Sequence, residues 1–140
     1  MGAPVVTPQG LVGLVSSVSP NTAEVRLITD PGVQIAVSLI ISPDGERADQ
    51  ISVQPRGVVS ATSGSAVGVL QLRHLQRGVQ APSRTKVVTN GKGGLFPPAF
   101  TVGYLTGTLH ADESGLEQVA QVAPSVDFTL LEDVFIRREG

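Results

Sequence analysis

The sequence has no cysteine and few aromatic or charged residues. Because none of its 140 residues is cysteine, disulfide bonds, thiol catalysis and thiolate metal sites are excluded. Aromatic residues make up 4% and charged residues 16% of the chain, so the core must consist mainly of valine, isoleucine and leucine. Such a composition favours an all-β protein.

Long apolar segments and clustered positive charges are also lacking. The longest nearly apolar segment, 33–41, is interrupted by Gln34 and Ser38 and is far shorter than the roughly 20 residues that a membrane-spanning helix needs. The net charge is −2, and the ten basic residues are scattered along the chain. We therefore expect this segment itself to bind neither nucleic acid nor membrane.

Alternating apolar residues and turn signals divide the chain into short strands. Segment 5–18 is expected to be one loose, kinked strand, because Pro8, Gly10 and Gly13 interrupt its alternation. Further strands are expected at 23–29, 33–41, 58–62, 66–75, 86–89, 100–109, 116–122 and 134–136. Turns or bends are expected at Gly10, Gly13, Asp30, Gly91, Gly94, Gly103, Pro124 and Asp127. Short strands at this spacing indicate a barrel or a pair of small barrels.

A polar and charged segment at 42–55 is the best position for a domain boundary. We expect a partial first β-domain at residues 1–50 and a second β-domain at 51–140, with a last strand that can return to the first domain. One helical turn is expected at 126–133, capped by Ser125 or Asp127, since both side chains can accept hydrogen bonds from free N–H groups.

The stretch Gly94–Gly103 contains two consecutive prolines, Pro97 and Pro98. They remove two backbone donors and fix φ, so the stretch belongs at a sheet edge or a rigid corner. A structural corner is the favoured interpretation. Contact with a partner protein through an exposed apolar edge is the second, with the candidate residues Phe96, Pro97, Pro98 and Phe100.

Side-chain alternation makes two further predictions about strand faces. One strand should have a strongly apolar face formed by Phe100, Val102 and Tyr104. Another should place His74 on the same face as Leu70 and Leu72, where a packing role is favoured over that of a base or a metal ligand.

Catalytic and ligand-binding patterns are weak. Serine, histidine and aspartate are present, but Ser63–Ser65 lacks the strand-to-helix elbow that α/β-hydrolases use. His74 and His110 have no zinc spacing, and Gly91–Gly94 lacks the frame of a phosphate-binding loop. The three acidic residues around one turn are expected to be solvated rather than to bind calcium: Asp112, Glu113 and Glu117. We expect no catalytic residues, no cofactor and no metal.

Several short segments occur in the order found in one known family. They are Gly10–Gly13, Val18–Ala23, Leu27–Pro31, Gly94–Pro97, Val102–Gly103, Ser114–Leu116, Val122–Phe128 and Leu131–Val134. Through them the chain resembles, over roughly residues 5–137, the periplasmic β-rich region of the MreC family of bacterial rod-shape-determining proteins.

The resemblance implies two small β-barrel-like domains, arranged as in chymotrypsin-like proteases but without the active site. It implies a non-enzymatic scaffold of the cell-elongation machinery in the periplasm, anchored to the membrane in the full-length protein. The implied partners are a second copy, in a dimer or filament, and the elongation-specific penicillin-binding protein, MreB, MreD and RodZ. In the family a transmembrane helix, a coiled coil and the first β-strands precede the region matched here. The first barrel is therefore expected to be truncated, or to close with strands from the rest of the chain.

Two alternative functions remain open at the level of sequence. A chymotrypsin-like serine hydrolase would need serine, histidine and an acid within hydrogen-bond reach of one another. A ligand-binding β-barrel, for example one that binds peptidoglycan, is disfavoured by the shortage of aromatic residues for stacking.

Overall fold

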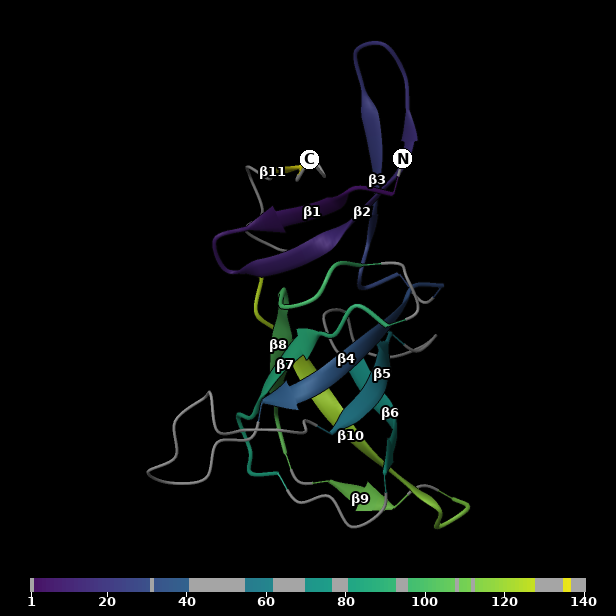
Figure 1. Ribbon diagram of the computed structural model, residues 1–140, viewed down its shortest axis with the longest axis vertical. Helices are drawn as coiled ribbons and strands as arrows, with labels where there is room; N and C mark the ends of the chain where they lie inside the picture. Colours follow the sequence, from purple (N-terminus) through teal and green to yellow (C-terminus); the bar gives the residue numbers. More distant parts are fainter. Residues whose placement is uncertain are drawn as a thin grey trace.

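The computed structural model describes residues 2–30, 32–40, 55–61, 70–76, 81–92, 96–107, 109–111, 113–127 and 135–136. Each regular element in these ranges is a β-strand, which confirms the all-β prediction. Figure 1 shows two stacked units, a barrel and a smaller sheet above it. None of the described segments forms a helix of the length and hydropathy that crossing a membrane requires.

The barrel is built from six antiparallel strands and is closed. Its strands are β4 (Gln34–Ile40), β5 (Arg56–Ser60), β6 (Leu70–Gln76), β7 (Lys86–Thr89), β8 (Thr101–Leu105) and β10 (Glu117–Pro124). They are hydrogen-bonded in the order β6-β5-β4-β7-β8-β10, and pairing of β6 with β10 closes the ring. The short strand β9 (His110–Ala111) extends the sheet beside the first half of β10.

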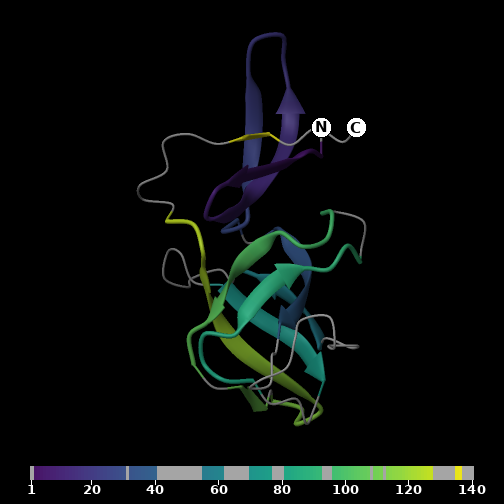
Figure 2. The ribbon, with the colours of Figure 1, turned by 60° about the vertical axis from the view of Figure 1, so that its left-hand side comes forward.

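The smaller sheet has four strands in the order β11-β1-β2-β3. They are β1 (Pro4–Thr7), β2 (Gly10–Val18), β3 (Ala23–Leu27) and β11 (Phe135–Ile136). The strand near the C-terminus thus returns to pair with β1, as Figure 2 shows. The hairpin of β2 and β3 projects beyond the rest of the molecule (Figure 1). Within the described residues this sheet stays open, whereas the other unit is a closed barrel.

Segment 5–18 is a hairpin, and the prediction of a single kinked strand was wrong. The chain reverses at Pro8 and Gln9, and the hydroxyl oxygen of Thr7 accepts a hydrogen bond from the N–H of Gln9 at 3.2 Å. Proline at this position cannot continue a ladder of backbone hydrogen bonds. As a result β1 and β2 pair with each other, with Pro4 opposite Leu14.

The pairing of β4 argues against a domain boundary near residue 50. Strand β4 is hydrogen-bonded to β5 on one side and to β7 on the other. A boundary at residue 50 would therefore separate two neighbouring strands of one barrel. We propose instead that the division lies between β3 and β4, where the chain passes from the small sheet into the barrel.

The barrel and the small sheet share one apolar core. The barrel contributes fully buried aliphatic side chains, which include Ile35, Val37, Leu39, Val59, Leu70, Leu72, Leu75, Val87, Val102 and Val122. Leu11 of β2 and Ile28, which directly follows β3, are 0% exposed and belong to the same cluster. Each such side chain contributes about 1.5–3 kcal/mol on burial. A second, smaller cluster contains Val5, Val12, Val15 and Val126.

Two β-bulges in the barrel change which side chains face the core. In β6 the register shifts so that Arg73 and His74 lie opposite one residue of β10, and His74 has a positive φ of 61°. Leu75 is consequently buried and His74 is exposed, so the predicted apolar position of His74 was wrong. A bulge adds one residue to one strand and thereby reverses the alternation beyond it.

The second bulge lies in β8. Val87 is opposite Gly103 while Val88 is opposite Thr101, which leaves Val102 as the additional residue. Val102 and Leu105 are both buried, whereas Tyr104 is 41% exposed. The prediction of one apolar face shared by Val102 and Tyr104 was therefore wrong at Tyr104.

The proline-rich stretch forms a corner between β7 and β8 that is held by hydrogen bonds to Thr89. The hydroxyl of Thr89 donates a hydrogen bond to the carbonyl of Pro97 at 2.6 Å and accepts one from the N–H of Phe100 at 3.0 Å. The backbone of Thr89 also exchanges hydrogen bonds of 2.8 Å with Ala99 and Phe100. Phe96 is 5% exposed and belongs to the barrel core, so this stretch is a structural corner.

The other predicted turn residues occupy different positions. Gly91 has a φ of 77° and follows β7, Pro124 is the last residue of β10, and Asp127 is exposed. Gly10 and Gly13 lie within β2. Gly94, most of the helical turn predicted at 126–133 and the polar segment 42–54 lie outside the described residues.

Gly103 is required by the close approach of β8 and β10. A methyl group on its Cα would collide with the backbone carbonyl oxygen of Ala123, whereas one on Gly107 would have no atom within 4 Å. We predict that Gly103→Ala lowers the free energy of unfolding by about 1–3 kcal/mol, because strand backbone must shift. Gly107→Ala is the control and should change it by less than about 0.5 kcal/mol. Urea denaturation measures both, and equal effects would contradict this packing.

A substitution at Phe96 tests whether this corner is part of the barrel core. Phe96→Ala should lower the free energy of unfolding by about 3–5 kcal/mol, because it leaves a cavity in the barrel. Pro98 is exposed, and Pro98→Ala should cost less than about 1 kcal/mol. Thermal and urea denaturation of both variants would show the difference. A Phe96→Ala protein as stable as the wild type would contradict the assignment of Phe96 to the core.

Candidate protein-interaction surface

The four predicted contact residues do not form an exposed apolar edge. Phe96 is buried, and Phe100 and Pro97 are half-buried. Phe100 packs against the barrel core. Phe96 is therefore withdrawn as a contact residue, because its ring is already used inside this chain. Pro98 and its neighbour Ala99 are exposed and remain the part of the stretch that a partner could reach.

A free strand edge is found instead on the small sheet. Closure of the barrel pairs both sides of each of its six strands. In the small sheet β3 is a terminal strand, and among the residues that the structure describes it pairs with β2 alone. Unpaired N–H and C=O groups along such an edge can bind an additional strand.

The hydrogen bonds of β2 show which backbone groups of β3 point outward. The N–H of Val15 donates to the carbonyl of Ala3 at 2.9 Å, and its carbonyl accepts from the N–H of Gly2 at 2.7 Å. Both polar groups of Val15 therefore face away from β3. Val25 lies opposite Val15, so it belongs to a pair that is not hydrogen-bonded, and its own N–H and C=O point to the free edge.

A shallow surface groove runs along this edge. Its lining consists of Ser16, Glu24, Val25, Arg26, Leu27, Thr29 and Asp30. Val25 and Leu27 are half-buried and pack against the second core cluster, which gives the groove an apolar strip. Glu24 and Arg26 are exposed and carry opposite charges. The groove thus combines free backbone groups, apolar side chains and both signs of charge.

The end of the groove is fixed by Asp30, one of the predicted turn residues. Its carboxylate accepts a hydrogen bond of 2.8 Å from the N–H of Gly32 and lies 3.5 Å from the guanidinium of Arg26. The backbone hydrogen bond from Gly32, and then the hydrogen bond and charge of Arg26, lower the pKa of the Asp30 carboxyl. The carboxylate therefore stays ionised at neutral pH, and the chain turns away from β3 here.

Sequence reasoning identified β3 as a strand but not as an edge. The alternation of Val25 and Leu27 with charged residues predicts a half-exposed strand. Which strands flank it depends on partners far away in the sequence. The one local signal is the presence of Glu24 and Arg26 on a short strand, since charged residues are common on edges.

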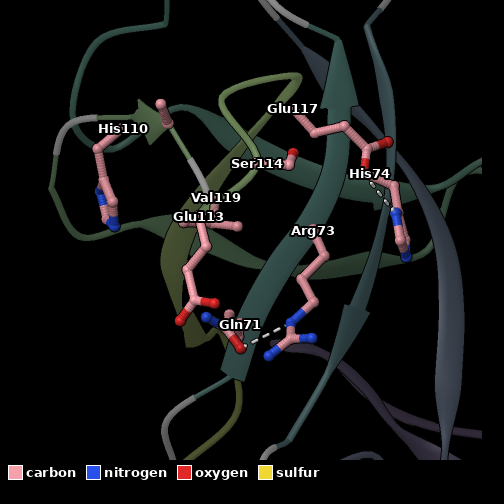
Figure 3. Close-up of a pocket in the computed structure, with 9 residues that line it drawn as sticks. Gln71, Arg73, His74, His110, Glu113, Ser114, Glu117 and Val119 are labelled. Atoms are coloured by element: carbon pink, nitrogen blue, oxygen red, sulfur yellow. Dashed lines mark hydrogen bonds and ion pairs between the residues drawn. The ribbon is translucent and has the colours of Figure 1, made fainter.

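A surface hollow is lined by both histidines and by Ser114, but the groups that a serine hydrolase needs do not meet there. Nδ1 of His74 lies 3.0 Å from Glu117 Oε1, while Ser114 Oγ accepts the N–H of Leu116 at 3.1 Å. In Figure 3 the imidazole of His74 points away from Ser114, and His110 stands on the opposite side of the hollow. A nucleophile and its base would have to face each other. This geometry does not support a serine hydrolase.

Binding of a ligand inside the barrel is not supported either. Eight strands leave an interior just wide enough for side chains, and this barrel has six. The interior is occupied by aliphatic side chains with 0% exposure, such as Ile35, Leu39 and Leu72. Among the described residues, no three His, Asp or Glu side chains are grouped so that they could hold a metal ion.

Comparisons with known proteins agree on one family. The family model for rod shape-determining protein MreC, barrel core, matches residues 1–138. The cell shape-determining protein MreC of Listeria monocytogenes serovar 1/2a is 30% identical over 136 residues, which are 97% of this chain and 43% of that protein. This chain therefore spans less than half the length of that curated relative.

Solved structures share the fold. An MreC structure has a TM-score of 0.77 at 24% identity and covers 96% of this chain and 69% of its own. MreC in a complex with a penicillin-binding protein (PBP2) from Helicobacter pylori has a TM-score of 0.66 at 15% identity. The match covers 96% of this chain and 75% of that one. The major periplasmic domain from the cell shape-determining filament MreC has a TM-score of 0.67 at 23% identity. The match covers 90% of this chain and 70% of that one. At these identities the likeness shows the fold alone. The family match over nearly the whole sequence shows that the chain belongs to the MreC family of rod shape-determining proteins.

Proposed function

We propose that this chain is a non-enzymatic scaffold segment of the cell-elongation machinery, which helps to maintain rod shape by self-association and by binding a peptidoglycan-synthesis protein. The observation that carries the proposal is the free edge of β3, where the N–H and C=O of Val25 point outward beside the groove. A strand of a partner can pair with this edge through its backbone, while Val25 and Leu27 select its side chains.

The proposed partner is the ectodomain of the elongation-specific penicillin-binding protein. The H. pylori complex of a penicillin-binding protein with MreC supports this choice, since that MreC has the fold of this chain. The solved periplasmic domain of an MreC filament supports a periplasmic position in the cell envelope and self-association as a dimer or filament. Membrane anchoring of the full-length protein, and contacts with MreB, MreD and RodZ, stay predictions.

Strand pairing at β3 requires no rearrangement of the barrel. A backbone hydrogen bond contributes about 0.5–1.5 kcal/mol net, so two or three along this edge would give a weak contact. Contacts of apolar side chains with Val25 and Leu27 would have to supply the remaining affinity. An interaction of this kind suits a scaffold, because partners can exchange without unfolding of either protein.

Substitution of Val25 tests the strand-pairing mechanism. Val25→Pro removes the outward N–H and leaves the hydrogen bonds between β2 and β3 in place, since proline is tolerated at the outer side of an edge strand. We expect affinity for the penicillin-binding protein ectodomain to fall about tenfold or more, because a backbone hydrogen bond is lost and the added strand meets the ring. Biolayer interferometry measures this binding, and sedimentation velocity measures self-association.

Val25→Ile is the matched control for this experiment. Isoleucine keeps the backbone N–H and an apolar, β-branched side chain, so binding should stay within about threefold of the wild type. Circular dichroism and thermal denaturation establish that both variants are folded. A folded Val25→Pro protein that binds and self-associates as the wild type does would refute pairing through the β3 edge.

A further inference from the structure

An apolar groove lies on the outer surface of the barrel, around the only tyrosine of the chain. It is lined by Ser83, Arg84, Tyr104, Leu105, Thr106 and Ala123, and its volume is about 560 Å³. This volume lies in the range of sites that hold a small ligand or a few residues of a peptide. The groove is formed by β8, β10 and the turn before β7, so it is separate from the β3 edge.

Tyr104 is at this surface because of the bulge in β8. In a regular strand Val102 and Tyr104 would lie on one face, but the bulge reverses the alternation, so Val102 is buried while Tyr104 is exposed. Bulges are frequent beside functional sites, where they redirect a side chain. An exposed tyrosine ring is also a common anchor in protein interfaces, since it combines apolar area with a hydroxyl group.

The turn that holds Arg84 is strained and firmly held. Arg84 has a positive φ of 71°, a conformation that costs an arginine of order 1 kcal/mol. Its N–H donates to the carbonyl of Leu105 at 2.8 Å. The hydroxyl of the buried Thr85 donates to the carbonyl of Pro82 at 2.6 Å. These hydrogen bonds fix the backbone that carries Arg84 at the rim of the groove.

Among the residues that the structure describes, the charged side chains identified at this groove are basic. Arg84 is in the lining, and Lys86 lies directly opposite Tyr104 in the ladder between β7 and β8, so it projects from the same face. None of the six lining residues is acidic. The floor is apolar, and the hydroxyl of Ser83 can hydrogen-bond a peptide backbone. The hydroxyl of Thr106 donates to the carbonyl of Gln121 at 3.4 Å and can still accept a hydrogen bond. A chain with net charge −2 therefore carries a local basic surface around one exposed aromatic ring.

We propose that the Tyr104 groove binds a short acidic segment of a protein partner through one apolar anchor residue. The anchor side chain packs on Tyr104, Leu105 and Ala123, while carboxylates on either side of it face Arg84 and Lys86. This site goes beyond the proposed pairing at β3, because the groove would recognise the side chains and charge of a partner rather than pair with its backbone. The barrel would thus have a binding site separate from the β3 edge.

The test uses a panel of capped pentapeptides with Leu, Phe, Tyr or Val at the centre and Asp or Glu at the four flanking positions. Titration followed by amide chemical shifts should move the signals of Arg84, Tyr104, Thr106 and Ala123. Added salt should weaken binding, because the flanking charges are solvent-exposed. The same peptides with Asn and Gln flanks should bind about fivefold more weakly or not at all.

Substitutions separate the groove from a general charge effect. Tyr104→Ser should weaken binding at least tenfold, as expected for an aromatic anchor. Arg84→Gln and Lys86→Gln should each weaken it about two- to fivefold. Lys92→Gln is the matched control: it removes the same charge from an exposed turn that does not line the groove, and it should leave binding unchanged.

Three results would overturn the proposal. The first is that no peptide at millimolar concentration shifts the amide signals around Tyr104. The second is that acidic and neutral peptides bind equally well. The third is that the protein binds phosphatidylglycerol vesicles instead of peptides and that Tyr104→Ser abolishes this vesicle binding. The last result would assign the groove to a membrane surface. Val25→Pro should bind the peptides normally, so failure of pairing at β3 and failure of the Tyr104 groove can be told apart.

Discussion

Closure of the barrel through the pairing of β6 with β10 is the constraint on which the rest of the structure depends. Leu70 lies opposite Val122 and Leu72 opposite Ala120 along this seam, and all four side chains are buried. The pairing joins segments that are far apart in the sequence and leaves no free edge among the six strands of the ring. The strand addition that we propose is therefore placed at the small sheet, where β3 is a terminal strand among the described residues.

The small sheet can present that edge because it is attached to the barrel through a common core. Leu11 and Ile28 are fully buried among barrel side chains, so the sheet is held in a defined position. The β2–β3 hairpin then projects away from the barrel, as Figure 1 shows. Because of this shared core, a partner strand at the proposed β3 site would be oriented with respect to the barrel and to the Tyr104 groove.

The two bulges give the barrel surface its specific side chains. Each adds one residue to a strand and reverses the alternation beyond it, so that Leu75 and Leu105 stay in the core while His74 and Tyr104 face solvent. His74 takes a left-handed conformation, which costs free energy in a residue other than glycine. The aliphatic core compensates for this cost, and His74 lies beside a surface hollow rather than inside the barrel.

The sequence by itself determined the all-β class, most of the strands and the family resemblance, because alternation and turn chemistry are local. The segment that forms β4 was recognisable as a core strand from its apolar residues alone. Only the tertiary structure decided that Phe96 is buried, that Tyr104 is exposed and that Val25 lies on a free edge. These outcomes depend on strand order and register, which are set by contacts between residues distant in the sequence. The local sequence pattern pointed to the proline-rich corner as the interaction surface, whereas the tertiary structure leads us to propose β3 instead.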